Sequence, residues 1–542
     1  MEQMESMAGL LPPVFVPPLS WLAKDTLSEE DLVREEVADR FRSHLAECRK
    51  AWKAAGMTEA EQKQAEEAEI SLILAKMESE EKKEEKIEEK AEPEAQLSSA
   101  EMQAYVDTVC DQIRWKQTRK AVAEELTDHL LLQKEAFLAE GLSEEEAEKR
   151  TVEEMGDGIA VGMALDRTHR PKPQWQMVLV AAVLLSMGLF CRLTIDQVSF
   201  GIDIVVPVLL AVALFGAAYF LDFTLLARKA KWVILLFLAM LILAVPFVEK
   251  SGGESVFFFF DYAYALTGMA LLAPLPFLSV LFFMRGRKER GYWFSWLAMA
   301  ILAALLFSFG KISMVLIFSI SAYGAFAVAV GTDWFSMGKQ KGKRLLALTT
   351  GAGIGVGGLA MLGIPALRYR LSFAVARVTG GEFGGGYFRY LVENIWENCR
   401  WLGSGTLPQN EMAMSVQLVL SQRQDLFSND ILLSRLGFAY GKLVVALVLA
   451  VFALFFLLSF QQIRKQRSAF GRMTAFSIWL VLLMQTVFFT AYNLGFMLVA
   501  PYALPLVSYG NTVLCINALL VGLLCSVFRR GEGVRDKDLA AA

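Results

Sequence analysis

The sequence contains few of the residues on which metal and nucleophile chemistry depends. Its three histidines, His44, His129 and His169, lie far apart, and its six cysteines show no closely paired spacing. Metal sites need closely grouped ligands, and a hydroxyl nucleophile needs a base beside it. The sequence therefore indicates no metal centre, no histidine-dependent triad and no disulfide framework.

A secretory signal is also missing from the N-terminal region. Residues 10–22 are apolar but interrupted by proline, and no basic stretch precedes them. A cleaved signal peptide carries a basic segment ahead of an unbroken apolar one. We therefore expect the first membrane span to direct the chain to its membrane.

Apolar residues are abundant instead. Of the 542 residues 55% are hydrophobic, with 38 Phe and 22 Met, and the mean hydropathy is +0.41. This composition excludes an ordinary soluble enzyme of this size. Residues 1–173 hold 40 acidic against 23 basic side chains, whereas the remainder has an excess of basic ones. The chain thus joins an acidic soluble part to an apolar, basic membrane part.

Runs of about 20 apolar residues predict about ten membrane-spanning helices. They lie near residues 175–192, 203–222, 232–248, 261–284, 291–309, 311–331, 345–367, 436–460, 471–498 and 503–527. The fourth run is interrupted by Asp261, Pro274 and Pro276. We therefore predict an all-α, polytopic membrane protein whose membrane domain covers residues 174–530.

Basic residues gather in alternate connections between these spans. The connections are residues 228–231, 285–290, 339–344, 464–472 and 529–530. Under the positive-inside rule they lie in the cytoplasm. Both termini then lie there as well, including a short tail of residues 531–542, because the number of spans is even.

Residues 96–173 show the spacing of a small three-helix cytoplasmic domain. Gly141 ends its second helix, and Ser143 with Glu146 forms a capping box that begins the third. Apolar residues recur at helical intervals, at Met102, Tyr105, Val109 and Ile113 and then at Val122, Leu126, Leu130 and Leu131.

This domain resembles the permease-prefix module found ahead of membrane proteins in Gram-positive bacteria. The residues that carry the resemblance are 124–129, 141–148 and 154–157. It implies an interaction or regulatory domain without chemistry of its own. The preceding residues 1–95, rich in Glu, Lys and Ala, are expected to form an acidic, partly helical extension and linker.

A long connection, residues 368–435, joins the seventh and eighth spans on the outer face. Long ordered loops often carry function. A glycine-dense turn at residues 380–386 suits close approach of the backbone to a ligand. Charges of both signs surround the turn: Arg368, Arg370, Arg377, Arg389, Arg400 and Arg423, with Glu382, Glu393, Glu397, Asp425 and Asp430.

The last two spans carry unusual polarity between Gln485 and Asn517. Within this stretch, Leu504–Asn511 contains proline, serine, tyrosine and glycine. Such groups would cost several kcal/mol in contact with lipid, so we expect them to face a protein interior or a wet cavity. Hydrogen bonding between packed helices, with Gly510 at the contact, is the structural alternative.

Together these motifs resemble the SEDS family (shape, elongation, division and sporulation), the group of FtsW, RodA and SpoVE. The resemblance covers roughly residues 175–530 and is strongest over 370–530. Three groups of residues carry it: Gln485, Asn493 and Gly495; Leu504, Pro505, Ser508, Tyr509 and Gly510; and, in the outer loop, Gly384, Gly386, Tyr387, Gly403 and Gly405.

The resemblance implies a peptidoglycan glycosyltransferase that polymerises lipid II at the outer face of the bacterial cytoplasmic membrane. Its partner would be a class B penicillin-binding protein or a similar synthase, and no nucleic acid is implied. Arginine or a divalent cation would neutralise the departing pyrophosphate, and no other cofactor is indicated. The implied substrate-binding residues are Arg370, Arg377, Gly384, Gly386, Tyr387, Gly403, Gly405, Gln485, Asn493, Pro505, Ser508, Tyr509 and Gly510.

One departure from the family bears directly on catalysis. The position of the family's proposed catalytic aspartate is Gly381, and the nearest carboxylate is Glu382. The chemistry needs a base for the acceptor hydroxyl, so we predict Glu382 as its substitute and Asp425 as a second candidate.

Two other functions stay open. The first is a catalytically degenerate paralogue that binds and regulates a cell-wall synthase. The second is a flippase or transporter of the lipid-linked precursor, which would place ionisable residues at mid-membrane. A role in division, elongation or sporulation is equally open.

Overall fold

The computed structural model describes residues 53, 100–169, 173–195, 201–244, 248–251, 254–259, 262–308, 312–379, 386–409, 413–421, 429–508, 510–530 and 536. The chain divides into two compact units. The first comprises residues 1–106 and 124–155, and the second comprises residues 107–123 and 156–542. Apart from residue 53, the predicted extension up to residue 95 lies outside the described residues.

The described part of the chain ahead of the first predicted span is helical, as the apolar periodicity predicts. Its helices are α4 (Ala100–Gln112), α5 (Lys116–Ala139), α6 (Glu144–Met155) and α7 (Gly158–His169), the last in addition to the three expected. Met102, Val109 and Ile113 are fully buried, which confirms the predicted apolar face of the first helix.

The predicted capping box at the start of α6 is also confirmed. The Glu146 carboxylate accepts hydrogen bonds from the Ser143 hydroxyl at 2.7 Å and the Ser143 backbone N–H at 3.3 Å. Ser143 Oγ accepts in turn from the Glu146 N–H at 3.4 Å. These bonds hold the pKa of the Glu146 carboxyl below its usual range.

A lysine ties α5 to α6. The Lys134 ammonium donates to Glu148 Oε1 at 2.6 Å and to Glu144 Oε1 at 2.9 Å. Its side chain is buried, whereas that of Glu144 is exposed. The hydrogen bonds to Glu148 and Glu144 raise the pKa of Lys134, because they stabilise its charged form.

Helices occupy all of the predicted spans within the described residues. They are α8 (Trp175–Thr194), α9 (Ile202–Phe220), α11 (Ala230–Ala244), α12 (Pro274–Phe283), α13 (Lys288–Ser308), α14 (Ile312–Gly331), α15 (Lys339–Gly363), α21 (Lys442–Arg464), α22 (Ala469–Asn493) and α23 (Asn511–Arg530). Six of them, namely α8, α13, α14, α21, α22 and α23, are long and apolar enough to cross a membrane. The helices α9, α11 and α12 are apolar but shorter. The chain is therefore a polytopic, helical membrane protein.

The fourth predicted span, 261–284, is only partly an α-helix. A small antiparallel sheet, β1 (Val248–Ser251), β2 (Glu254–Phe259) and β3 (Tyr262–Ala265), reaches into it, and a 3₁₀ helix covers Leu266–Leu272. In this sheet Glu249 lies opposite Val256 and Phe258 lies opposite Ala263. The α-helix starts only at Pro274, because proline suits the first turn of a helix and not its interior.

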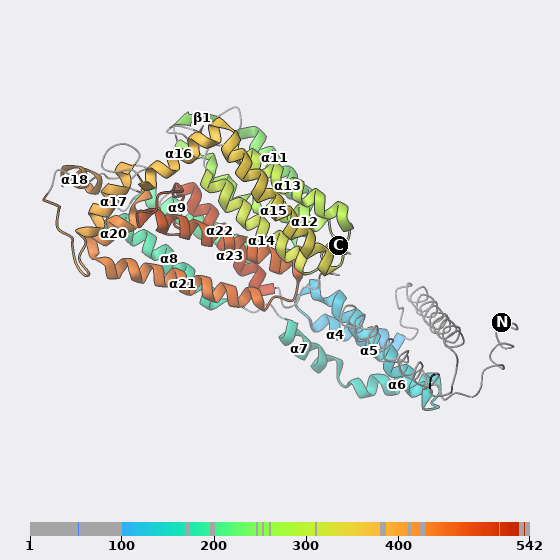
Figure 1. Cartoon of the computed structure of the whole chain (residues 1–542). Helices are drawn as coiled ribbons and strands as arrows, with labels where there is room; N and C mark the ends of the chain where they lie inside the picture. Colours follow the sequence, from blue (N-terminus) through green and yellow to red (C-terminus); the bar gives the residue numbers. More distant parts are fainter. Residues whose placement is uncertain are drawn as a thin grey trace. The chain divides into compact units, whose positions relative to one another are not determined.

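The outer connection is largely helical within its described part. It contains the end of α16 (Pro365–Thr379), α17 (Tyr387–Glu397), α18 (Ala413–Ser421) and α20 (Leu432–Tyr440). In Figure 1, α17, α18 and α20 gather at one end of the helix bundle. We call this the loop end.

Close helix contacts form the centre of the membrane domain. The helix α14 packs against α22, α23 packs against α9, and α21 runs alongside α8 (Figure 1). A Cβ on Gly522 of α23 would lie 2.5 Å from the carbonyl oxygen of Phe215 in α9. The missing side chain lets the two backbones touch, as is common between membrane helices.

The basic connections lie together at the opposite end, which we call the basic end (residues 228–231, 285–290, 339–344, 464–472 and 529–530). There Arg530 pairs with Asp222 at 3.5 Å, and Lys341 pairs with Glu289. The first pair joins the end of α23 to the end of α9, and the second joins α15 to α13. The helix ends that carry these connections are therefore on one side, as the alternation of spans predicts.

A residue of the predicted C-terminal tail caps α22 at the basic end. Asp536 accepts hydrogen bonds from the Ser468 hydroxyl at 2.7 Å and from the backbone N–H groups of Ala469 at 2.8 Å and Phe470 at 3.3 Å. Arg285 donates to the backbone carbonyl of Asp536. A carboxylate at this position satisfies unpaired N–H groups and complements the helix dipole.

Candidate functional site

Residues 504–508 of the motif form a turn ahead of α23. The tenth span was predicted to begin at residue 503, but the helix begins at Asn511. Ser508 closes the turn: its Oγ accepts from the Leu504 N–H at 2.8 Å, and its own N–H donates to the Leu504 carbonyl at 3.0 Å. Pro505 and Ser508 are buried, and Leu506 has a left-handed φ of 62°. Proline and these local bonds explain why the chain is not helical here.

Helix α8 covers one side of this turn. A Cβ on Gly188 would lie 2.6 Å from the carbonyl oxygen of Leu506 and 2.8 Å from that of Val507. A small cavity of about 20 Å³ remains between them, lined among others by Arg192, Ser508 and Asn511. That space holds about one water molecule. In the described residues, the motif therefore lines a closely packed contact rather than a wide substrate chamber.

Gln485 and Asn517 form an amide pair inside the membrane domain. Gln485 Nε2 donates to Asn517 Oδ1 at 3.1 Å, and Asn517 Nδ2 donates to Gln485 Oε1 at 3.3 Å. Both side chains are fully buried. The predicted site residue Gln485 thus has a partner on α23 that the spacing of motif residues in the sequence did not identify.

Asn493 connects the end of α22 to the outer connection. Its Oδ1 accepts from the Ser434 N–H at 3.1 Å, and its Nδ2 donates to the Asp430 carbonyl at 2.8 Å. Its backbone carbonyl accepts from Trp396 Nε1 at 2.5 Å. Because Asn493 is fully buried, these bonds fix α17 and α20 on the end of α22.

A charged group lies beside the Asn493–Gly495 motif at the loop end. Arg389 Nε donates to Glu393 Oε1 at 2.6 Å, and Arg389 also donates to the Val378 carbonyl of α16. A Cβ on Gly495 would lie 3.6 Å from Glu393 Oε1. Both charged side chains are partly exposed, so their polar ends can meet a ligand.

An apolar cavity of about 460 Å³ adjoins this charged group. Val378 and Thr379 of α16 line one side, and Val487, Phe488 and Ala491 of α22 line another. Val378 is also the residue whose carbonyl meets Arg389. Apolar space with a few charged groups at its edge is the usual form of a site for an amphipathic ligand.

The two glycine motifs of the outer connection have clear structural positions. Gly386 precedes α17, and Tyr387 packs into a cluster that includes Leu391. The Gly403 N–H donates to the Tyr440 carbonyl at 3.0 Å, and the Gly405 N–H donates to the Phe438 carbonyl at 2.7 Å. The second motif thus attaches the connection to the end of α20.

Cys399 lies just before that second motif. Its thiol donates to the Ile395 carbonyl at 3.0 Å and is buried. Burial raises the pKa of the Cys399 thiol to about 11, and nearby Lys442 opposes the rise. This cysteine is therefore structural and unreactive at neutral pH.

Several residues of the predicted site belong to segments outside the described part of the chain. Gly381, Glu382, Gly384, Asp425 and Tyr509 lie outside the described residues, as does the side chain of Arg370. Their roles, and the proximity expected between Glu382 and the Ser508 turn, stay predictions. Arg377 lies on α16, within electrostatic range of Tyr492.

Spacing alone missed the partners of the predicted residues. Asn517, Ser434 and Trp396 lie far from their partners in sequence, and no pattern points to them. Arg389 and Glu393 could have been identified, because ion pairs four residues apart are typical of helices. Among the described residues, no group of three or more His, Cys, Asp or Glu is placed to hold a metal ion.

Comparison with known proteins finds a family match in the C-terminal part of the chain. The model of the cell cycle protein family FtsW/RodA/SpoVE matches residues 403–532, which include the Gly403, Asn493 and Ser508 motifs. No curated protein sequence matches the chain. The C-terminal part of the membrane domain is therefore similar to the FtsW/RodA/SpoVE family.

Solved structures show similarity to this chain. One, described as "Structural coordination of polymerization and crosslinking by a peptidoglycan synthase complex", is 20% identical with a TM-score of 0.51, and the match covers 66% of this chain and 98% of that one. The crystal structure of the rod shape determining protein RodA of Thermus thermophilus is 17% identical with a TM-score of 0.44, and the match covers 66% of this chain and 97% of that one.

Proposed function

We propose that this chain acts in cell-wall synthesis as a peptidoglycan glycosyltransferase that polymerises lipid II. The observation that carries the proposal is the Arg389–Glu393 pair at the edge of the apolar cavity between α16 and α22. Lipid II joins a long apolar tail to a pyrophosphate and sugars. A cavity that is apolar inside and charged at its edge has the matching polarity.

The reaction sets the roles of the charged groups. A carboxylate takes the proton of the acceptor hydroxyl, and the oxygen of that hydroxyl forms the new bond to the anomeric carbon of the donor. The bond from that carbon to the pyrophosphate breaks, and the leaving group departs as an anion. Arg377 and Arg389 would neutralise it, alone or with a divalent cation. We assign the base to Glu382, with Asp425 as the second candidate, and we add Glu393 because it lies beside Gly495.

The charge distribution and the comparisons support the proposed setting. The loop end would face the outside of the bacterial cytoplasmic membrane, because the basic end fits the cytoplasmic side. The protein of the similar structure belongs to a peptidoglycan synthase complex. We accordingly propose a class B penicillin-binding protein or a similar synthase as the partner of this chain.

The second candidate function is a catalytically degenerate paralogue that binds such a synthase and regulates it. Gly381 favours it, because a glycine at the family's catalytic aspartate position leaves no proton acceptor there. The structure of the soluble helices is compatible with a binding role for residues 96–173.

Polymerisation of lipid II by the full-length chain in proteoliposomes tests the proposal, with and without the partner synthase made inactive in its own transferase site. We expect glycan strands from the wild type, and a loss of at least about 100-fold for the variant that removes the base, since general-base catalysis contributes ~10²–10⁴-fold. The variants are Glu382→Gln, Asp425→Asn and Glu393→Gln, with the exposed Glu397→Gln as control.

Absence of product from the wild type under both conditions contradicts the proposed glycosyltransferase activity. Binding of the synthase without product then supports the degenerate paralogue. If the wild type makes product and all three variants keep its rate, the assignment of the base is wrong while the activity stands.

A further inference from the structure

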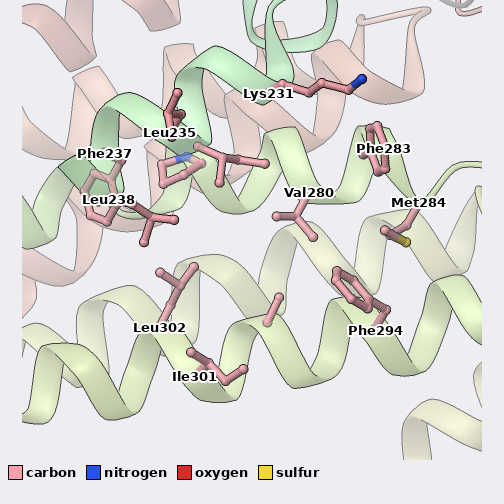
Figure 2. Close-up of a pocket in the computed structure, with 13 residues that line it drawn as sticks. Lys231, Leu235, Phe237, Leu238, Val280, Phe283, Met284, Phe294, Ile301 and Leu302 are labelled. Atoms are coloured by element: carbon pink, nitrogen blue, oxygen red, sulfur yellow. The ribbon is translucent and has the colours of Figure 1, made fainter. Parts of the chain in front are cut away.

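A second apolar groove lies near the basic end, away from the loop end. It has a volume of about 470 Å³ and is formed by α11, α12 and α13. Leu238, Val280 and Ile301, one from each helix, face its interior (Figure 2). Except for Lys231, every side chain that lines it is apolar. Its interior therefore suits hydrocarbon and offers no polar recognition.

Two cations meet at the mouth of this groove. The Lys231 ammonium lies 5.9 Å from the centre of the Phe283 ring, and the Arg287 guanidinium carbon lies 4.7 Å from the same centre. Both cations are exposed. Figure 2 shows Lys231 and Phe283 at the same side of the groove. One ring is thus shared by two positive charges that can also reach a ligand outside the protein.

Two exposed tryptophans near the mouth indicate its depth in the bilayer. Trp232 follows Lys231 directly and is 67% exposed, and Trp293 in the second turn of α13 is 49% exposed. Tryptophan is enriched where the hydrocarbon of a bilayer meets its headgroups. The mouth of the groove therefore lies at headgroup depth, with the apolar interior at acyl-chain depth.

We propose that this groove is a binding site for an anionic phospholipid of the leaflet at the basic end. One acyl chain occupies the space between α11, α12 and α13, and the headgroup phosphate lies between Lys231 and Arg287. Charge complementarity selects the occupant, because an uncharged or zwitterionic headgroup gains less from two adjacent cations. The site is independent of the proposed polymerisation, which uses the opposite end of the domain.

Lipid retention by the full-length chain tests this site. The purified protein is exchanged into mixed micelles with phosphatidylglycerol or phosphatidylcholine of identical acyl chains, and bound lipid is counted by native mass spectrometry. We expect phosphatidylglycerol to be preferred, and each cation to contribute about 5-fold. The double variant Lys231→Ala, Arg287→Ala should lose the preference by ~25-fold.

A matched double variant separates a site from diffuse charge. Lys229→Ala with Arg290→Ala removes two exposed cations of the same connections that do not line the groove. We expect it to keep the preference. An equal loss in both double variants, or equal retention of the two lipids by the wild type, overturns the proposal.

A third variant tests the acyl-chain part with the charges intact. Ala298→Phe fills the groove from α13. It should reduce lipid retention while Lys231 and Arg287 remain, and its thermal unfolding should be compared with the wild type to verify folding. Undiminished retention by the folded variant places the lipid outside the groove. Inorganic phosphate should not displace the lipid, and displacement by it identifies a phosphate site instead.

Discussion

Gln485 and Asn517 satisfy each other's amide groups across the interface between α22 and α23, through two hydrogen bonds of 3.1 and 3.3 Å. Neither side chain reaches solvent. Each amide thus offsets the cost of burying the other, because an unpaired amide in a membrane domain carries a desolvation penalty.

Replacement of both amides should therefore cost less than the two single replacements added together. We expect Gln485→Leu and Asn517→Leu each to lower the thermal unfolding midpoint in detergent. The double variant should lose less than the sum, with a coupling free energy of about 0.6–1.7 kcal/mol. Leu457→Met on the exposed face of α21 is the control. Additive effects would show that the two amides do not interact.

Gly188 should not tolerate a side chain. We expect Gly188→Ala to push the Leu506 carbonyl away and to destabilise the fold by about 1–3 kcal/mol, as overpacking does. Gly216→Ala on α9 has open space and should be neutral or slightly stabilising. Thermal unfolding of the two variants measures the difference, and equal midpoints would contradict the close contact.

Asn493 should control the attachment of the outer connection. Asn493→Ala leaves the buried Ser434 N–H without its acceptor, and we expect a cost of about 1–3 kcal/mol. Trp396→Phe removes a single bond to the Asn493 backbone and should cost less. Limited proteolysis within residues 386–440 should be faster in the alanine variant. Unchanged cleavage would show that the connection is held elsewhere.

Asp536 should keep the end of the chain against α22. We expect Asp536→Ala to cost about 1 kcal/mol, as loss of a helix cap does, and Asp536→Asn to cost less because it retains an acceptor. Hydrogen exchange of Ala469 and Phe470 gives the measurement, since their N–H groups lose the Asp536 acceptor when the cap is removed. Protection that is equal in all three proteins would rule out the cap in solution.

The stability of the α5–α6 contact should depend on the charge of Lys134. Because the pKa of Lys134 is raised in the folded state, its contribution is complete below its ordinary value of about 10.4 and is lost as the pH rises through the raised value. Hydrogen exchange of α5 and α6 should show a difference between wild type and Lys134→Met at pH 8 that shrinks at high pH. Lys149→Met at an exposed position is the control, and a difference independent of pH would exclude the ionic contribution.

Much of the fold was accessible from the sequence, because long apolar runs and helical periodicity are local signals. They predicted three of the four described helices ahead of the first span, the capping box at Ser143 and at least part of a helix at every span. The segment 248–272 was not predictable, because its aromatic run Phe257–Phe259 is as apolar as a helix would be. Only the β-ladder and the late helix start at Pro274 distinguish it.

The candidate site was predictable as a set of positions and not as a set of contacts. The spacing of residues in the sequence identified Gln485, Asn493 and Ser508 but not their partners. Gln485 bonds to a helix distant in sequence, Asn493 to the outer connection, and Ser508 to its own turn. Their polar groups are engaged within the protein, which explains how such residues are accommodated in a membrane domain. Their contact with the substrate is a prediction.

The contact of Gly188 with Leu506 has a consequence for the biogenesis of this protein. More than half of the chain is synthesised between these two residues, and Gly522 of α23 likewise awaits contact with α9. The early helices must therefore remain in the bilayer, with a notch (the unfilled space beside Gly188), until the late helices are synthesised. A chain that stalls before α23 would present that notch to lipid, to a chaperone or to a membrane protease, so quality control can sense completion at this interface.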